Sequence, residues 1–209
     1  MGIKERKERE KDRRRQQIII AAKRIFSENG YNKATMEDIA REAEISPGTI
    51  YIYFKNKDEL YASLSIRILQ HLNIRLEHVK NEKGINGIQK IISLKEALYD
   101  VYDFDPLILI NLFHLQSSES LKNLSPGLLS EIKRLSKSSL QIIADIFSEG
   151  IEKGVFVEQN PLALADILWA LFSGVILWEE SKKIIDNKKD FLKPTLDIAF
   201  DIFRQGVTK

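Results

Sequence analysis

The chain has 209 residues, with 32 Lys and Arg against 30 Asp and Glu, and it contains no cysteine. This length can bury a substantial core, either in one compact domain or in a small domain joined to a larger one. The lack of cysteine excludes disulfides, thiolate metal sites and cysteine nucleophiles. We see no signal peptide and expect a cytoplasmic protein. The longest apolar stretch, Leu162 to Trp178, is shorter than the ~20 residues that cross a bilayer, so we expect no membrane partner.

The positive charge is concentrated at the N-terminal end. Residues 1–24 contain ten Lys and Arg against four Asp and Glu. An excess of this kind is typical of a segment that meets phosphate groups. The alternative is that Lys4 to Arg15 form a solvated helical extension, held by mixed-sign pairs such as Glu5 with Arg9 and Glu10 with Arg14. The sequence leaves both interpretations open.

Two helices are predicted at the start of the chain. From Gln16 onward, apolar residues recur at three- and four-residue steps and form one stripe, made of Ile18, Ala21, Ala22, Ile25 and Phe26. Gly30 ends this helix, because glycine adopts the left-handed C-terminal conformation at little cost. A second, short helix begins at Thr35, whose hydroxyl can cap it while Asp38 reaches back.

The third helix has the clearest start signal. Ser46 is predicted as its N-cap and Pro47 as its first residue, and the helix continues to Phe54. Ile45 and Ile50 occupy the positions of a hydrophobic staple, which would fix the angle at which the chain enters the helix. Two short helices joined by a tight turn, with the second pinned at its start, form a helix-turn-helix.

The rest of the chain is also predicted to be helical. A long helix runs from Lys57 to Lys80, and a second contains Ile88 to Val101 and ends near Asp105-Pro106. Further helices are expected over residues 107–115, 126–154, 161–187 and 189–205, with a loop over residues 116–125. The predicted fold class is therefore all-α.

The stretch from Ile18 to Leu64 closely resembles the DNA-binding region of the TetR/AcrR family of repressors. The resemblance rests on Asn29-Gly30-Tyr31, on Thr35 opening the second helix, on the segment from Ser46 to Phe54, and on Lys57. It implies an N-terminal three-helix helix-turn-helix DNA-binding domain, with a basic extension, over residues 1–56. Residues 57–209 would form a larger helical ligand-binding and dimerisation domain. It also implies a subunit that dimerises through its last two helices and leaves DNA when a small molecule binds.

The third helix supplies most of the predicted DNA contacts. Successive helical residues lie ~100° apart, so Ile50 and Phe54 share one face while Tyr51 and Ile52 lie on the other. Small residues at its start would let backbone amides approach a phosphate. The resemblance implies phosphate contacts by Thr35, Tyr51 and Lys57, and base contacts by Thr49 and position 52. The full set of predicted DNA-binding residues is Thr35, Ser46, Pro47, Gly48, Thr49, Tyr51, Ile52, Lys55 and Lys57.

Three positions depart from the family's pattern. Ile52 stands where a polar or aromatic residue is frequent, and an exposed Ile suits a thymine methyl group better than a hydrogen bond. Pro47 stands where a basic residue is common and supplies no donor. Glu44 occupies a turn position that often has glycine. An alternative role for the aromatic residues of this segment, strongest for Phe54, is packing of the three-helix core.

The helix after Pro161 is apolar on nearly all sides, so it must be covered on both. We expect one side to meet a symmetry mate, giving a homodimer with a two-fold four-helix contact. The predicted interface residues are Ala170, Gly174, Leu196, Phe200 and Phe203. Two recognition helices related by a two-fold axis require an inverted-repeat operator.

An effector pocket is predicted among aromatic residues, which suit an apolar ligand with one polar group. The candidates are Tyr99, Tyr102, Phe104, Phe113, His114, Trp169 and Phe172. The alternative for each is ordinary core packing. His71 and His78 share a helix face but lack a third metal ligand nearby, so we expect no metal.

The function predicted from these features is a ligand-responsive transcriptional regulator, a repressor released from double-stranded DNA by a small hydrophobic effector. We expect no cofactor and no enzymatic activity, because the sequence has no glycine-rich phosphate loop, no activated nucleophile and no metal-spaced cluster. The alternative is a helical carrier of a hydrophobic ligand that no longer binds DNA, which Ile52 and Pro47 keep open. In the regulator, ligand entry would tilt the long helix from Lys57 and change the separation of the two recognition helices.

Overall fold

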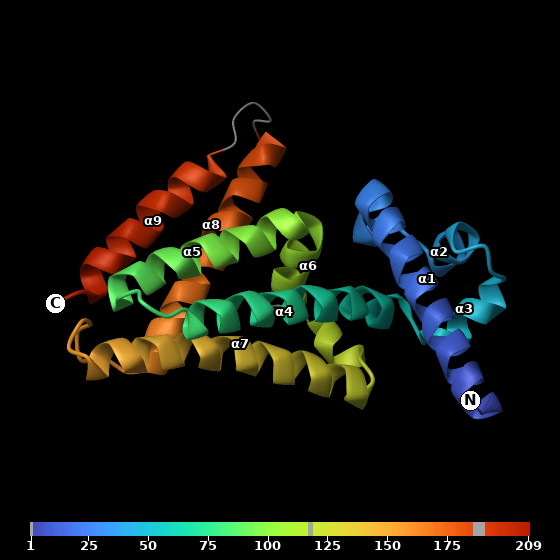
Figure 1. The fold of residues 1–209 in the computed structure, drawn as a ribbon. Helices are drawn as coiled ribbons and strands as arrows, with labels where there is room; N and C mark the ends of the chain where they lie inside the picture. Colours follow the sequence, from blue (N-terminus) through green and yellow to red (C-terminus); the bar gives the residue numbers. More distant parts are fainter. Residues whose placement is uncertain (1, 117–118, 186–190) are drawn as a thin grey trace.

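The computed structural model describes residues 2–116, 119–185 and 191–209 (Figure 1). Within these residues the chain is helical, apart from turns, short connections and one isolated bridge between Phe156 and Thr208. The elements are α1 (Ile3–Lys33), α2 (Met36–Glu42), α3 (Pro47–Tyr53), α4 (Lys57–Asn81), α5 (Gly87–Phe104), α6 (Pro106–Gln116), the 3-10 helix η1 (Glu119–Asn123), α7 (Pro126–Glu152), α8 (Pro161–Ile185) and α9 (Leu192–Val207). The predicted all-α class is confirmed.

Helices α1, α2 and α3 pack together at one end of the molecule (Figure 1). Their shared core contains the stripe predicted on α1, together with Ile39 of α2, Ile50 of α3 and Phe54. The predicted stop at Gly30 is present as a break, because Gly30 has a φ of 70° and the helix changes direction there. The helix extends back to Ile3, beyond the three-helix core, so the segment before Gln16 is helical, as one of the two interpretations of Lys4 to Arg15 required.

The remaining helices surround α4. Figure 1 shows α4 running through the middle of the larger part, with α5 and α7 along its two sides. Helix α8 packs against α7, and α9 packs against α5 and α8. The expected loop over residues 116–125 contains η1, and residues 117–118 lie outside the described part. Helix α9 begins at Leu192. The expected start at Lys189 lies outside the described residues.

A buried carboxylate connects the two parts of the molecule. Glu59, near the start of α4, is 6% exposed. One of its oxygens accepts a hydrogen bond from the Lys55 N–H at 3.0 Å, and the other accepts one from the Ser125 N–H at 3.1 Å. Burial alone would raise the pKa of Glu59, but these N–H groups hold it below its ordinary value. The carboxylate therefore joins the segment after α3 to the start of α7.

Two further contacts cross the same junction. Asp58 accepts hydrogen bonds from the Tyr31 hydroxyl, at the end of α1, and from the Asn123 side chain in η1. Lys23 of α1 forms an ion pair of 2.5 Å with Asp105, which is buried at the start of α6. The helix-turn-helix is thus held to the larger part at the start of α4 and at the α5–α6 corner.

A tight packing contact in the larger part occurs where α7 meets the segment after it. The Phe156 ring is fully buried and lies directly on the Cα of Gly150. A methyl group added at Gly150 would overlap that ring, whereas one added at Gly127, near the start of α7, would meet open space. The glycine at position 150 is therefore required by packing.

We expect Gly150→Ala to lower the free energy of unfolding by about 1–2 kcal/mol. Overpacking of a tight core costs about 1–3 kcal/mol, and the better helix propensity of alanine offsets up to ~1 kcal/mol of this. Urea denaturation at one fixed protein concentration measures the change. Gly127→Ala is the matched control and should leave the stability unchanged or slightly raised. Equal stability of the two variants would contradict the packing described here.

Candidate functional site

The two faces of α3 lie as predicted. Ile50 and Phe54 are buried at 0% and 1% exposure, and Tyr51 and Ile52 are exposed at 48% and 73%. The Thr49 N–H donates to the Ser46 hydroxyl oxygen at 3.2 Å, so the predicted N-cap is present. Helix α3 is therefore fixed by its inner side and offers two large side chains to the outside.

The start of α2 is capped as predicted. The Thr35 hydroxyl oxygen accepts a hydrogen bond from the Asp38 N–H at 3.1 Å, and the Asp38 carboxylate accepts one from the Thr35 N–H at 3.2 Å. In the turn between α2 and α3, Glu44 has a φ of 55°. This left-handed conformation favours glycine and is strained for other residues, so Glu44 is held in a strained turn.

Arg15 of α1 supports the C-terminal end of α3. Its guanidinium donates to the Tyr53 carbonyl oxygen at 3.2 Å and to the Ser63 hydroxyl at 3.3 Å, and it lies 4.3 Å from the centre of the Phe54 ring. Sequence reasoning did not single out Arg15. The N-cap contact at Ser46 and the Arg15 contact at Tyr53 hold α3 at both ends.

Lys57 is engaged inside the protein. Its ammonium donates to the carbonyl oxygens of Tyr31 at 2.7 Å and Ala34 at 3.0 Å, and it lies 4.3 Å from the centre of the Tyr31 ring. These contacts fix the segment that joins α1 to α2. Its predicted phosphate contact stays a prediction and would use the remaining donor of the ammonium.

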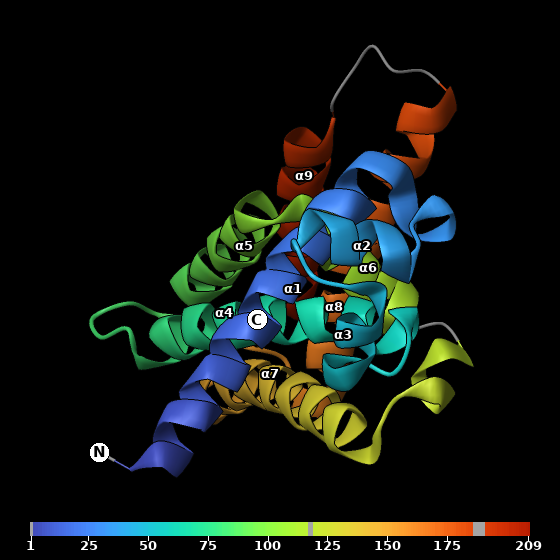
Figure 2. The same ribbon diagram turned by 90° about the vertical axis from the view of Figure 1, so that its right-hand side faces the viewer.

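The other predicted DNA-binding residues lie at the surface around α3. Thr49 is half-buried, and the exposed ones are Thr35, Ser46, Pro47, Gly48 and Lys55. The structure therefore brings an exposed set together around Tyr51 and Ile52, at one end of the molecule. Figure 2 shows α2 and α3 on the side that faces the viewer.

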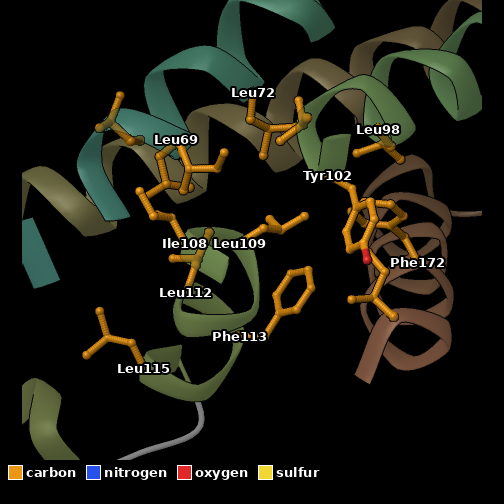
Figure 3. Packing of buried hydrophobic residues seen from close by; sticks show 14 of the residues in the cluster. Leu69, Leu72, Leu98, Tyr102, Ile108, Leu109, Leu112, Phe113, Leu115 and Phe172 are labelled. Carbon is orange, nitrogen blue, oxygen red and sulfur yellow. The ribbon is translucent and has the colours of Figure 1, made fainter. Parts of the chain in front are cut away.

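Three of the predicted pocket residues form one cluster between α6 and α8. The ring of Phe113 lies edge-on to Trp169 and Phe172, with centroid distances of 5.6 and 6.2 Å. Tyr102 of α5 is buried nearby, and its hydroxyl lies 3.4 Å from the Glu180 carboxylate. Figure 3 shows Phe113, Tyr102 and Phe172 converging from α6, α5 and α8.

The remaining predicted pocket residues, Tyr99, Phe104 and His114, lie outside this cluster. Phe104 is 47% exposed and stacks on His71 at 4.3 Å. His114 is exposed, and Tyr99 is half-buried with Lys193 over its ring at 5.3 Å. One pocket lined by all seven residues is therefore not what the structure shows, because α5 and α6 direct their aromatic side chains to different sides.

A separate apolar hollow lies between η1, α7 and the start of α8. Its volume is about 510 Å³, within the range of about 300–1,000 Å³ typical of small-molecule sites. Its lining is mostly apolar, with two lysines and one aspartate, and comprises Leu121, Leu129, Ile132, Lys133, Ser136, Lys137, Leu140, Gln141, Leu162 and Asp166. Within the described residues the hydroxyl of Ser136 is buried and makes no hydrogen bond. The hollow thus combines apolar walls with the charged side chains of Lys133, Lys137 and Asp166.

Sequence reasoning missed this hollow. The signal on α7 was the spacing of Leu129, Ile132, Ser136 and Leu140, which is that of one helix face. That pattern predicts a packed face equally well. This face of α7 is left uncovered because of where η1 and α8 lie, and their positions cannot be derived from the spacing on α7.

The predicted dimer interface needs a correction on α9. Leu196, Phe200 and Phe203 are buried inside their own subunit, at 2%, 3% and 8% exposure. The exposed apolar residues of α9 are Ile198 and Ile202, on the opposite side of the helix. The prediction selected the larger of two apolar faces, and the larger face packs against α5 and α8.

The predicted interface residues of α8 lie at the surface, and their place in a dimer interface stays a prediction. Ala170 and Gly174 are exposed, on the same side as Ile167 and Trp178, which are 53% and 63% exposed.

By length and composition alone, Pro161–Lys182 could cross a membrane, although core helices pass the same test. Within the described residues, no three His, Asp or Glu side chains come together as a metal site.

Comparisons with known proteins match this geometry. The family model for bacterial regulatory proteins of the tetR family matches residues 18–64. The fatty acid metabolism regulator protein of Bacillus subtilis (strain 168) is 32% identical over 151 residues, which cover 71% of this chain and 74% of that protein.

Solved structures show the same fold. The transcriptional regulator FadR from Bacillus subtilis, in complex with stearoyl-CoA, has a TM-score of 0.69 and 23% identity, covering 91% of this chain and 98% of that one. The TetR family regulator PfmR from Thermus thermophilus has a TM-score of 0.71 and 19% identity, covering 92% and 99%. Because a relative 32% identical covers most of both sequences, and the DNA-binding segment matches the family model, this chain belongs to the TetR family of bacterial transcriptional regulators.

Proposed function

We propose that this regulator is a dimeric repressor that binds an inverted-repeat operator through α3 and leaves it when a long-chain fatty acyl compound binds. The observation that carries DNA binding is the division of α3 into a buried face with Ile50 and an exposed face with Tyr51 and Ile52. An exposed isoleucine can contact the methyl group of thymine in the major groove. Tyr51 can donate its hydroxyl to a phosphate oxygen.

Dimerisation is supported by the outer faces of α8 and α9. Trp178, Ile198 and Ile202 are each more than 60% exposed, and large apolar patches of this kind are typical of interaction sites. Ala170 and Gly174 on the same side of α8 allow close helix approach. A two-fold contact here would place two copies of α3 in successive major grooves, about 34 Å apart, which requires an inverted repeat.

The effector class is inferred from the hollow and from the relatives. The Bacillus subtilis relative is a fatty acid metabolism regulator, and a protein of the same fold was solved with stearoyl-CoA. In this chain the apolar walls of the hollow suit an acyl chain. Lys133 and Lys137 at its edge suit the negative charges of a fatty acyl-CoA or fatty acid.

Effector binding would reach α3 through the start of α4. Leu121 of η1 lines the hollow, and two residues further on Asn123 donates to Asp58 at 3.2 Å. The Ser125 N–H donates to Glu59, which also holds the Lys55 N–H directly after α3. A ligand that displaces η1 would therefore change contacts that position the helix-turn-helix relative to α4.

We further infer that the chain acts on DNA in the cytoplasm and has no enzymatic activity of its own. Its relatives are transcriptional regulators. The proposed output is a change in operator affinity.

We expect Ile52→Ala to weaken operator binding by about ten-fold or more and to relax the preference at one base pair of each half-site, since a lost base contact costs about 1–3 kcal/mol. Gel shifts with DNA from upstream of the protein's own gene, repeated across a salt series, measure both effects. The thermal stability should stay unchanged, because surface substitutions usually alter stability by less than about 0.5 kcal/mol.

Ile50→Ala is the control on the buried face. It should lower the free energy of unfolding by about 2–5 kcal/mol, because it leaves a cavity in the core. Wild-type protein that binds without sequence preference or salt dependence would contradict the regulator and favour a ligand carrier. An Ile52→Ala variant with wild-type affinity and preference would remove Ile52 from the base contacts.

We expect palmitoyl-CoA to release the wild-type protein from its operator, and Lys137→Glu to weaken palmitoyl-CoA binding about ten-fold. An exposed ion pair contributes up to ~1 kcal/mol, and the reversed charge adds a repulsion of similar size. Calorimetric titration at low and high salt measures the affinity, and the difference should shrink at high salt. Lys83→Glu, at an exposed position away from the hollow, is the matched control.

Two results would contradict this prediction in different ways. If palmitoyl-CoA binds but operator affinity does not change, the proposed effector role is wrong. If Lys137→Glu and Lys83→Glu behave alike, the ligand's charged end does not lie at the edge of the hollow.

A further inference from the structure

The first half of α1 extends beyond the helix-turn-helix core. The helix begins at Ile3, whereas its first buried residue is Ile18. In Figures 1 and 2 the N-terminal end of α1 projects away from the other helices, past α3. The projecting part of α1 gains little stability from burial, because it does not pack against other helices. Core packing therefore does not account for the residue types along it.

One face of α1 changes character where the helix leaves the protein. The buried stripe Ile18, Ala22 and Ile25 continues toward the N-terminus, at steps of three and four residues, as Arg14, Lys11 and Lys7. The face that meets the apolar core in one half of the helix is therefore basic in the other half. We call Lys7, Lys11 and Arg14 the basic stripe.

The side chains of the basic stripe are not held in ion pairs within the described residues. Within the described residues no ion pair involves Lys7, Lys11 or Arg14, although Arg13 pairs with Glu10 at 2.7 Å. The acidic residues Glu5, Glu8 and Asp12 follow their own steps of three and four on another face. Glu10 pairs directly with Arg13, and the half-buried Arg14 lies near Glu10, Glu42 and Glu44 without a described ion pair. The solvated-extension interpretation, in which Glu10 pairs with Arg14, therefore does not account for this face.

The basic stripe begins beside the C-terminal end of α3. Arg15, the next residue along α1, donates to the Tyr53 carbonyl oxygen and stacks on the Phe54 ring. Because α1 is one continuous helix from Ile3 to the break at Gly30, this contact also sets the direction of its free half. The second group of basic residues, Arg6, Arg9 and Arg13, continues the side of Ile20 and Arg24, which are exposed and face away from the core.

We propose that the basic stripe binds the phosphate backbone of duplex DNA outside the half-site contacted by α3, so that the free half of α1 widens the operator footprint. The stripe from Lys7 to Arg14 is about 10 Å long at 1.5 Å per residue, which matches the rise of about three base pairs. Each neutralised phosphate releases counterions and adds affinity that falls with salt. The inference rests on the proposed DNA binding by α3.

The test compares two triple variants of the full-length protein with equal charge change. One removes the basic stripe (Lys7→Gln, Lys11→Gln, Arg14→Gln), and the other removes the opposite group (Arg6→Gln, Arg9→Gln, Arg13→Gln). Glutamine keeps the helix propensity of lysine and arginine. Operator affinity is measured from low to moderate salt. The duplexes are taken from the footprint that the wild-type protein leaves upstream of its own gene. One duplex ends at the half-sites, and the other carries flanks of about ten base pairs, roughly one helical turn.

The stripe variant should lose about five units of the slope of log K against log salt, because a dimer carries two stripes and so about six phosphate contacts at ~0.9 each. Its operator affinity should not rise when the duplex carries the flanks. The opposite variant should lose less than about one unit of this slope. It should still bind the flanked duplex more tightly than the duplex that ends at the half-sites. Equal losses in both variants, or a stripe variant indistinguishable from wild type, would overturn the inference while leaving operator binding by α3 intact. Wild-type protein that binds no operator would overturn both the inference about the basic stripe and the proposed DNA binding by α3.

Discussion

The structure depends on the burial of one side of a seven-residue helix. Helix α3 is too short to be stable alone, and it is held because Ile50 and Phe54 are removed from water in the core that α3 shares with α1 and α2. Ser46 and Arg15 fix its two ends. The exposure of Tyr51 and Ile52 follows from this arrangement, since they occupy the side of the helix that the core does not cover. Core packing thereby determines which side chains can meet a nucleic acid.

The same helix-turn-helix is joined to the larger part by few, specific polar contacts. Glu59 and Asp58 connect the segment after α3 and the end of α1 to η1 and the start of α7, and Lys23 pairs with Asp105 at the other corner. A buried carboxylate that loses its donors leaves an uncompensated charge, so such contacts have two clearly different states. This property suits the proposed route, in which the junction responds to a ligand bound beside η1.

Local signals in the sequence predicted much of the fold and of the DNA-binding face. The caps at Thr35 and Ser46, the glycine at position 30 and the rotation of 100° per residue were sufficient for α2 and α3, because these features act within one or two turns. On α9 the same reasoning selected the wrong face. Phe200 and Ile202 are both apolar, and only the placement of α5 and α8 decides which side is inward. The hollow at Ser136 and the support of α3 by Arg15 were missed for the same reason, since both depend on elements far apart in the sequence.

A structure of the protein bound to its operator tests the central claim most directly. The account predicts that the two copies of α3 enter successive major grooves about 34 Å apart, or one helical turn, with Ile52 against the bases and Tyr51 at a phosphate. A complex in which α3 lies away from the duplex, with DNA held by another surface, would contradict it.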